Sequence, residues 1–186
     1  MIHTVRTACV PVMRYRDADV ADGYGNRRVV VLDADTGRYK RHWGAYGGRP
    51  DDTQVPAYNP AAPPSKHFNT VHCTNVSKDG FVYVCDRVND RVQVFRKDGT
   101  FVKEAFFEKS TLRSGSVWDM TFSRDPQQTY IYIANGVNEK ISLVLRSTLE
   151  VLTAPRASSW RWWPRSRSTL RTRNRRATCA PGTTCR

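Results

Sequence analysis

The sequence predicts an all-β fold, namely an incomplete β-propeller of about two and a half four-stranded antiparallel blades. Three segments of the chain echo one another, and short runs of β-branched and aromatic residues are bounded by turn signals. The repeat length is near 45 residues, and repeats of this size are typical of propeller blades and of helical solenoids. The strand-like hydrophobic runs exclude the solenoids, because helices would place apolar residues every three or four positions.

Three anchor positions define the repeat: an aspartate or asparagine, then an asparagine, then a basic residue that opens a β-branched run. In chain order the anchors are Asp22, Asn26 and Arg28, then Asp86, Asn89 and Arg91, then Asn135, Asn138 and Lys140. The first anchors lie 64 and 49 residues apart. This inequality disappears when a proline-rich stretch at 48–66 is treated as an insertion.

These anchors predict the domain organisation. We expect an irregular segment over 1–18, a partial propeller over 19–152 and a disordered tail over 153–186. Within the propeller, the blades are expected near 19–47, 67–107 and 114–152. The expected strands are 28–33 and 38–43 in the first blade, 72–77, 81–85, 91–96 and 101–105 in the second, and 117–123, 129–134, 140–145 and 149–152 in the third.

The first blade is expected to be incomplete. Its innermost strand is missing from the pattern, and the acidic run RDADV stands where an apolar second strand is expected. A propeller closes to hide its strand edges, so a partial one leaves edge strands and an inner face uncovered. We therefore expect the isolated chain to be marginally stable or prone to association.

Composition limits the class of protein. The chain has 186 residues, 39% of them hydrophobic, which is globular and excludes wholesale disorder. No stretch approaches the roughly 20 apolar residues of a membrane helix, and the N-terminus shows no secretory signal. The sequence does not indicate a compartment. The five cysteines include no CxxC pair, and we interpret them as unbridged thiols.

The net charge of +13 is concentrated in the tail over 153–186, which contains nine arginines, three tryptophans and no acidic residue. Arginines could contact phosphates while Trp160, Trp162 and Trp163 stack on bases, or the segment could dock on an anionic membrane surface. A shifted reading frame in GC-rich coding DNA would give the same composition. We favour that interpretation and do not expect nucleic acid to be the partner.

Two segments resemble a known family. VADGYGNRRVVVLDADTGRYKRHWG and FNTVHCTNVSKDGFVYVCDRVNDRVQVFRKDGTFVKE are similar to NHL-repeat six-bladed propellers, and within them to the peptidylamidoglycolate lyases and related bacterial propellers. The resemblance implies a zinc-dependent lyase that converts peptidyl-α-hydroxyglycine to an amidated peptide and glyoxylate. The substrate, a peptide or small molecule, would lie at the mouth of the central channel.

The resemblance assigns roles to three residues. His72 matches a zinc-binding histidine, Tyr24 a catalytic tyrosine that moves a proton, and Arg87 an arginine that holds the substrate carboxylate. Each also has a structural alternative. His72 could bond to a neighbouring blade, Tyr24 could cap its own blade, and Arg87 could form a surface salt bridge. We interpret Asp22 and Asp86 as structural, because they recur at the same point of successive repeats.

The sequence also departs from the family. Alignment of Ser77 with Ser123 places Trp118 where His72 stands, so the third blade supplies no histidine. One histidine cannot build a catalytic zinc site, and we expect this chain to be inactive although intact relatives would use zinc. The alternative function is a non-catalytic propeller scaffold that binds a peptide, glycan or protein partner.

Overall fold

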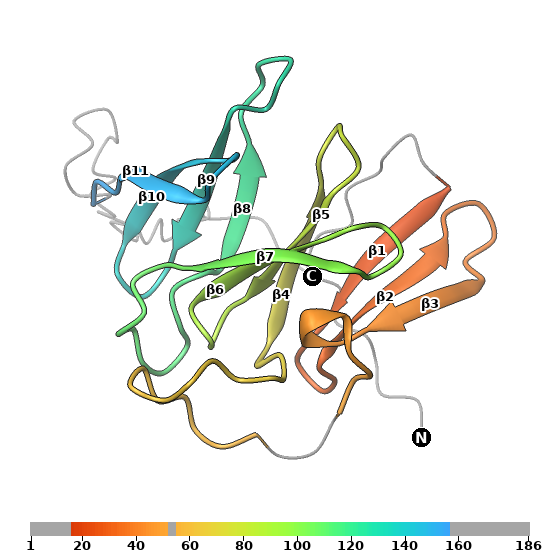
Figure 1. The fold of residues 1–186 in the computed structure, drawn as a ribbon, viewed down its shortest axis with the longest axis horizontal. Helices are drawn as coiled ribbons and strands as arrows, with labels where there is room; N and C mark the ends of the chain where they lie inside the picture. Colours follow the sequence, from red (N-terminus) through yellow and green to blue (C-terminus); the bar gives the residue numbers. More distant parts are fainter. Residues whose placement is uncertain (1–15, 52–54, 157–186) are drawn as a thin grey trace, which may run out of the picture.

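The computed structural model describes residues 16–51 and 55–156. Three antiparallel sheets lie side by side, with the middle sheet between the other two (Figure 1). One short 3₁₀ helix, η1 (Ala45–Gly47), interrupts the strands of the described residues. No helix in this part of the chain is long and apolar enough to cross a membrane. The fold is all-β, as the sequence predicted.

The three sheets correspond to the three predicted repeats. Blade 1 contains β1 (Asp17–Asp22), β2 (Arg28–Asp33) and β3 (Tyr39–Trp43). Blade 2 contains β4 (Val71–Val76), β5 (Val82–Asp86), β6 (Arg91–Phe95) and β7 (Phe101–Phe106). Blade 3 contains β8 (Asp119–Phe122), β9 (Tyr130–Asn135), β10 (Lys140–Leu145) and β11 (Glu150–Thr153).

Blades 2 and 3 have strands in simple up-and-down order, each paired with the next along the chain. All eight of their strands begin and end within two residues of the predicted positions. The β4–β5 and β6–β7 turns of blade 2 use the predicted glycines where the backbone needs a positive φ, with Gly80 at 87° and Gly99 at 92°.

The start of blade 1 differs from the prediction. The acidic run forms β1, which begins at Asp17, two residues before the expected boundary of the blade. Cross-strand cations make this possible, because the Asp17 carboxylate pairs with Lys40 and lies 2.7 Å from the Arg41 guanidinium. The interpretation that this run replaces a strand is therefore wrong.

The cysteine interpretation is also wrong for one pair. Cys73 on β4 and Cys85 on β5 lie opposite each other in the sheet and form a disulfide. Both side chains are buried at the interface between blades 2 and 3. The other cysteines lie outside the described residues, as does the arginine-rich tail beyond residue 156.

Two hydrophobic clusters hold the blades together, and each is shared by two neighbouring sheets. The first joins blades 1 and 2 and includes Val29, Val31, Trp43, Val71, Val82, Val84 and Phe95. The second joins blades 2 and 3 and includes Tyr83, Val92, Val94, Met120, Ile131, Ile133 and Val144. The single sheet of the middle blade therefore buries both of its faces, as alternation of side chains along a strand allows.

The anchor residues of the repeat form the same small network at one end of each blade. In blade 2 the Asp86 carboxylate accepts hydrogen bonds from the Asn89 amide at 2.8 Å and from Arg91 Nε at 2.8 Å. In blade 1 Asp22 accepts bonds from Asn26 and Arg28 at 2.8 and 2.9 Å. These contacts give the two aspartates a structural role that the repeat alone had indicated.

Blade 3 carries the neutral version of this network. Asn135 accepts bonds from the backbone N–H and side-chain amide of Asn138, at 3.2 and 3.0 Å. Because Asn135 has no charge, Lys140 extends instead to Glu108, with Nζ 2.6 Å from Oε1. The position is thus equivalent in all three blades, while the ion pair is present in only two.

Candidate functional site

The three residues that the resemblance selected lie together at one end of the blades. Tyr24 comes from the β1–β2 turn, His72 from β4 and Arg87 from the β5–β6 turn. The Tyr24 hydroxyl lies 3.1 Å from His72 Nε2 and 3.1 Å from Arg87 Nη1. Residues separated by up to 63 positions in the chain therefore form one contiguous cluster.

A β-bulge places the His72 side chain in this cluster. Val71 pairs with Asp86 and Cys73 pairs with Cys85, so His72 is the extra residue on β4. A bulge bends its strand and redirects the side chain at that point. Thr70, just before the bulge, has a φ of 75°, which is strained for a β-branched residue.

The hydrogen bonds of His72 assign its protons. Nδ1 bonds to the backbone carbonyl of Trp118 in blade 3, and because a carbonyl only accepts, Nδ1 carries the proton. Nε2 is then an acceptor for the Tyr24 hydroxyl, whose oxygen accepts from Arg87 in turn. The cluster is therefore a chain of hydrogen bonds in which Arg87 donates to Tyr24, Tyr24 donates to His72, and His72 donates to the Trp118 carbonyl.

The surroundings keep this imidazole neutral. Burial lowers the pKa of His72, and the nearby charge of Arg87 lowers it further. The bond to the Trp118 carbonyl and the charge of Asp119 act in the opposite direction but are outweighed. A neutral Nε2 next to a phenol can accept a proton from it, which is a requirement for acid–base chemistry.

Arg87 lies between two aromatic rings. Its guanidinium carbon is 5.4 Å from the centre of the Tyr24 ring and 5.2 Å from that of Trp118. Its buried Nε has no hydrogen-bond partner among the described residues. In this part of the chain Arg87 also forms no salt bridge, so the surface ion pair offered as its alternative role is absent there. Cation–π contacts orient the group without neutralising its charge.

Trp118 also belongs to the site, and the sequence did not predict its contribution. The repeat alignment identified it only as the position where a histidine is lacking. Its ring covers Gly136, where an added Cβ would lie 2.5 Å from Cδ2, and its backbone holds His72. No local pattern could have shown this, because the contacts connect blades 2 and 3.

Two glycines allow the blades to approach closely enough for the cluster to form. A Cβ on Gly23 would lie 2.1 Å from the Val71 carbonyl oxygen, and one on Gly115 would lie 1.9 Å from the Arg87 carbonyl oxygen. No side chain fits at either distance. The backbones next to Tyr24 and next to Arg87 are therefore packed directly on their neighbours.

The donor set around His72 does not fit zinc. A catalytic zinc needs three protein ligands, usually histidine nitrogens or carboxylates. One imidazole nitrogen, one phenol and the guanidinium of Arg87 meet here, and a guanidinium repels a second cation. Within residues 16–51 and 55–156 no group of three His, Cys, Asp or Glu side chains is placed to hold a metal ion.

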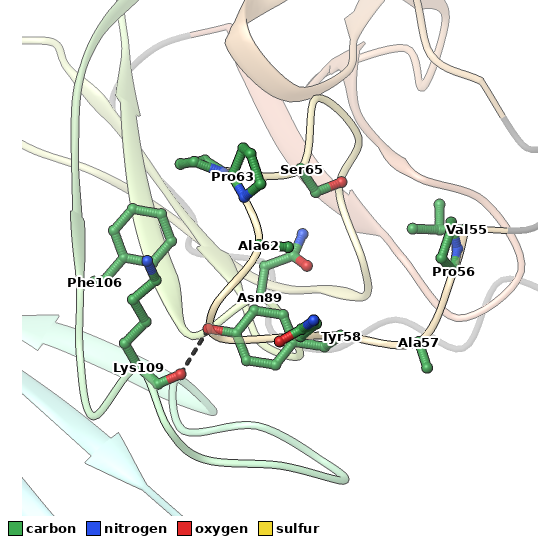
Figure 2. Close-up of a pocket in the computed structure, with 12 residues that line it drawn as sticks. Val55, Pro56, Ala57, Tyr58, Ala62, Pro63, Ser65, Asn89, Phe106 and Lys109 are labelled. Carbon is green, nitrogen blue, oxygen red and sulfur yellow. Dashed lines mark hydrogen bonds between the residues drawn. The ribbon is translucent and has the colours of Figure 1, made fainter.

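A separate cavity of about 410 Å³ lies between the proline-rich insertion and blade 2 (Figure 2). Its wall is mainly apolar, and the Lys109 ammonium lies 5.2 Å from the centre of the Phe106 ring. Tyr58 crosses the floor and donates a hydrogen bond of 2.7 Å to the Lys109 carbonyl. Burial, together with the charge of Asp90, raises the pKa of Tyr58 to about 12, so this phenol stays protonated.

Comparison with known proteins supports the fold alone. No family model matches the sequence, and no curated protein matches it. Among solved structures, the chain is similar to U3-55K, with 11% identity and a TM-score of 0.57 over 84% of this chain, and to the WD40 repeats of RRP9, with 12% identity and a TM-score of 0.57 over 86%. Hydrazine synthase from Kuenenia stuttgartiensis matches with 15% identity and a TM-score of 0.50 over 75%.

These neighbours include WD40 β-propellers, so the three sheets are blades of a propeller. The chain spans about a third to two fifths of the length of the three proteins, 32% of the hydrazine synthase chain and 41% of each of the other two. Neither the NHL type nor lyase activity follows from identities this low.

Proposed function

We propose that the chain is part of an NHL-type propeller whose cluster of Tyr24, His72, Arg87 and Trp118 binds the carboxylate of a peptide or small molecule. One observation carries this proposal: a phenol from blade 1 joins a neutral imidazole and a cation from blade 2 in one chain of hydrogen bonds that ends on a backbone carbonyl of blade 3. The resemblance to peptidylamidoglycolate lyases assigns Arg87 the same role, that of holding the substrate carboxylate.

The surroundings of Arg87 support carboxylate binding. Arginine presents several N–H donors in a plane, which suits a two-pronged bond to a carboxylate. Tyr24 is 63% exposed, so a ligand can reach the phenol and the guanidinium from the open end of the blades. An entering carboxylate would supply the counter-charge that the described residues do not.

Tyr24 and His72 are suited to proton movement beside the bound ligand. The phenol donates to a neutral imidazole, and that imidazole is held in one orientation by the Trp118 carbonyl. In the lyase resemblance zinc would supply the Lewis acid, but the donor set here does not fit it. We therefore propose binding without turnover for this chain.

Hippurate, which is N-benzoylglycine, tests the carboxylate proposal because its counterpart hippuramide has the same skeleton with a neutral amide in place of the carboxylate. Titration calorimetry is expected to show hippurate binding at least about tenfold tighter than hippuramide, the effect of one charge-assisted pair. Arg87→Gln should abolish this preference. Arg124→Gln, which removes an exposed arginine in the β8–β9 turn, should leave it unchanged. Equal affinity for the two probes would refute the proposal.

Turnover is tested separately. Purified chain incubated with a peptidyl-α-hydroxyglycine and zinc is expected to release no glyoxylate above the blank. Zinc-dependent release that is lost in His72→Ala would overturn the assignment of an inactive chain and restore the lyase.

The second candidate is a scaffold that binds a partner through the proline-rich insertion, and the cavity beneath that insertion favours it. Its apolar wall predicts a ligand with an exposed apolar side chain. Loss of partner binding in Phe106→Asp, with the hippurate preference intact, would assign recognition to the cavity.

A further inference from the structure

We propose that two copies of this chain associate head to tail, with blade 3 of each packing on blade 1 of the other, and close a six-bladed ring. Inside the chain, blade 2 contacts blade 1 with one face and blade 3 with the other. The two outer blades each have an equivalent face with no blade on it within the described residues.

On the uncovered face of blade 3, exposed side chains stand at the repeat positions whose equivalents in blade 2 pack against blade 3. Tyr132 occupies the repeat position of Tyr83, since the anchors Asn135 and Asp86 fix the alignment. Tyr83 is 2% exposed and packs edge-on against Phe122 at 5.0 Å, whereas Tyr132 is 40% exposed. Tyr130 is 36% exposed on the same face.

The strand next to it repeats the pattern. Leu143 pairs with Tyr132 and stands at the repeat position of Val94. Val94 is buried at the interface of blades 2 and 3, whereas Leu143 is only partly buried. The face that would receive a fourth blade is therefore present, and no other described segment covers it.

The uncovered face of blade 1 carries the matching half on its three strands, which correspond to β5, β6 and β7 of blade 2, and no described strand of blade 1 corresponds to the innermost strand β4. Leu32 and Tyr39 are paired across β2 and β3, as Phe95 and Phe101 are across β6 and β7. In blade 2 the Phe95 ring is fully buried against Trp43 of blade 1, at 5.9 Å. In blade 1 the equivalent Leu32 is only partly buried and Tyr39 is 58% exposed.

Blades 1 and 3 lie on opposite sides of blade 2 (Figure 1), so within residues 16–51 and 55–156 the two halves of the blade interface are uncovered at opposite ends of the row of blades. A contact between different faces of identical chains forms a ring when the rotation closes and a filament when it does not. Closed propellers have four to eight blades, and two chains of three blades supply six. A second copy is the occupant that covers both faces with the strands that blades 1 and 3 already contain, while the innermost strand missing from the described part of blade 1 leaves that position of the contact unfilled.

Light scattering coupled to gel filtration tests the association on the chain of 186 residues. We expect twice the chain mass of 21.3 kDa. Tyr39→Asp and Tyr132→Asp should each yield monomers. In either variant, one of the two faces that meet in every contact carries a new aspartate, whose charge would be buried by association. Both tyrosines are exposed in the single chain, so circular dichroism should show unchanged β-structure. Leu112→Asp is the matched control, an exposed apolar side chain on the β7–β8 loop, and should stay dimeric.

Mixing the two variants distinguishes the head-to-tail arrangement. The intact blade 3 of Tyr39→Asp can meet the intact blade 1 of Tyr132→Asp, so a heterodimer with one interface should form, visible by native mass spectrometry with one variant isotope-labelled. A dimer that survives Tyr39→Asp would indicate a face-to-face contact of two copies of blade 3 and overturn the proposal. A monomeric native chain, or growth into filaments, would also overturn it.

Discussion

Asp19 is a buried carboxyl group whose charge opposes folding. It is 7% exposed on β1, and its Oδ1 has no hydrogen-bond partner among the described residues. Burial raises its pKa to about 6 despite the nearby Arg41, and burial raises the pKa of Asp90 to about 6 as well. The folded chain therefore holds these protons more tightly than the unfolded chain does, and stability falls as pH rises from about 4 through 6.

Asp19→Asn should remove this penalty for one of the two groups. Above pH 6 we expect a gain of up to about 3 kcal/mol in the free energy of unfolding, the equivalent of about two pKa units. Urea unfolding at pH 4.5 and 7.5 measures it. Asp98→Asn is the control, because bonds from Thr100 lower the pKa of that exposed carboxyl, so its contribution has the opposite sign. A gain at pH 4.5 equal to that at pH 7.5 would contradict the role of the Asp19 charge.

At the scale of elements, the turn between β1 and β2 fixes the distance between blade 1 and β4. Gly23→Ala would place a Cβ 2.1 Å from the Val71 carbonyl oxygen, so the turn must move away and carry Tyr24 from His72. We expect a loss of about 1–3 kcal/mol in stability and a weaker preference for hippurate over hippuramide. Thermal melts and calorimetry measure the two effects.

Gly25→Ala is the matched control two residues along the same turn. Nothing lies within 4 Å of its added Cβ, and the change should alter stability by no more than about 0.5 kcal/mol. If both variants behaved alike, the close approach at Gly23 would not be what positions Tyr24.

Predictability also differed from element to element. The strands of blades 2 and 3 were predicted because alternation and turn glycines are local signals. β1 was missed because its acidic residues are compensated from another strand, by Lys40 and Arg41. At the site, the resemblance selected Tyr24, His72 and Arg87, but the part played by Trp118 depends on contacts between blades that no spacing reveals.

For the whole molecule, the sharing of two clusters among three blades predicts uneven stability. Every residue of β5 and β6 is buried, whereas every residue of β11 is exposed. Amide exchange by local opening is slowest where burial is greatest. Hydrogen exchange followed by mass spectrometry should therefore show the greatest protection in β5 and β6 and the least in β11.

The same measurement separates the single chain from an assembled ring. Amide protection of β9, β10 and β2 should rise with protein concentration, because head-to-tail contact would cover their open faces. Protection of β5 and β6 should stay constant, because both strands are already buried within the single chain. The Tyr132→Asp chain should show no such rise at any concentration. Uniform protection across all three blades would instead mean that the chain unfolds as one cooperative unit, with the middle blade no more stable than its neighbours.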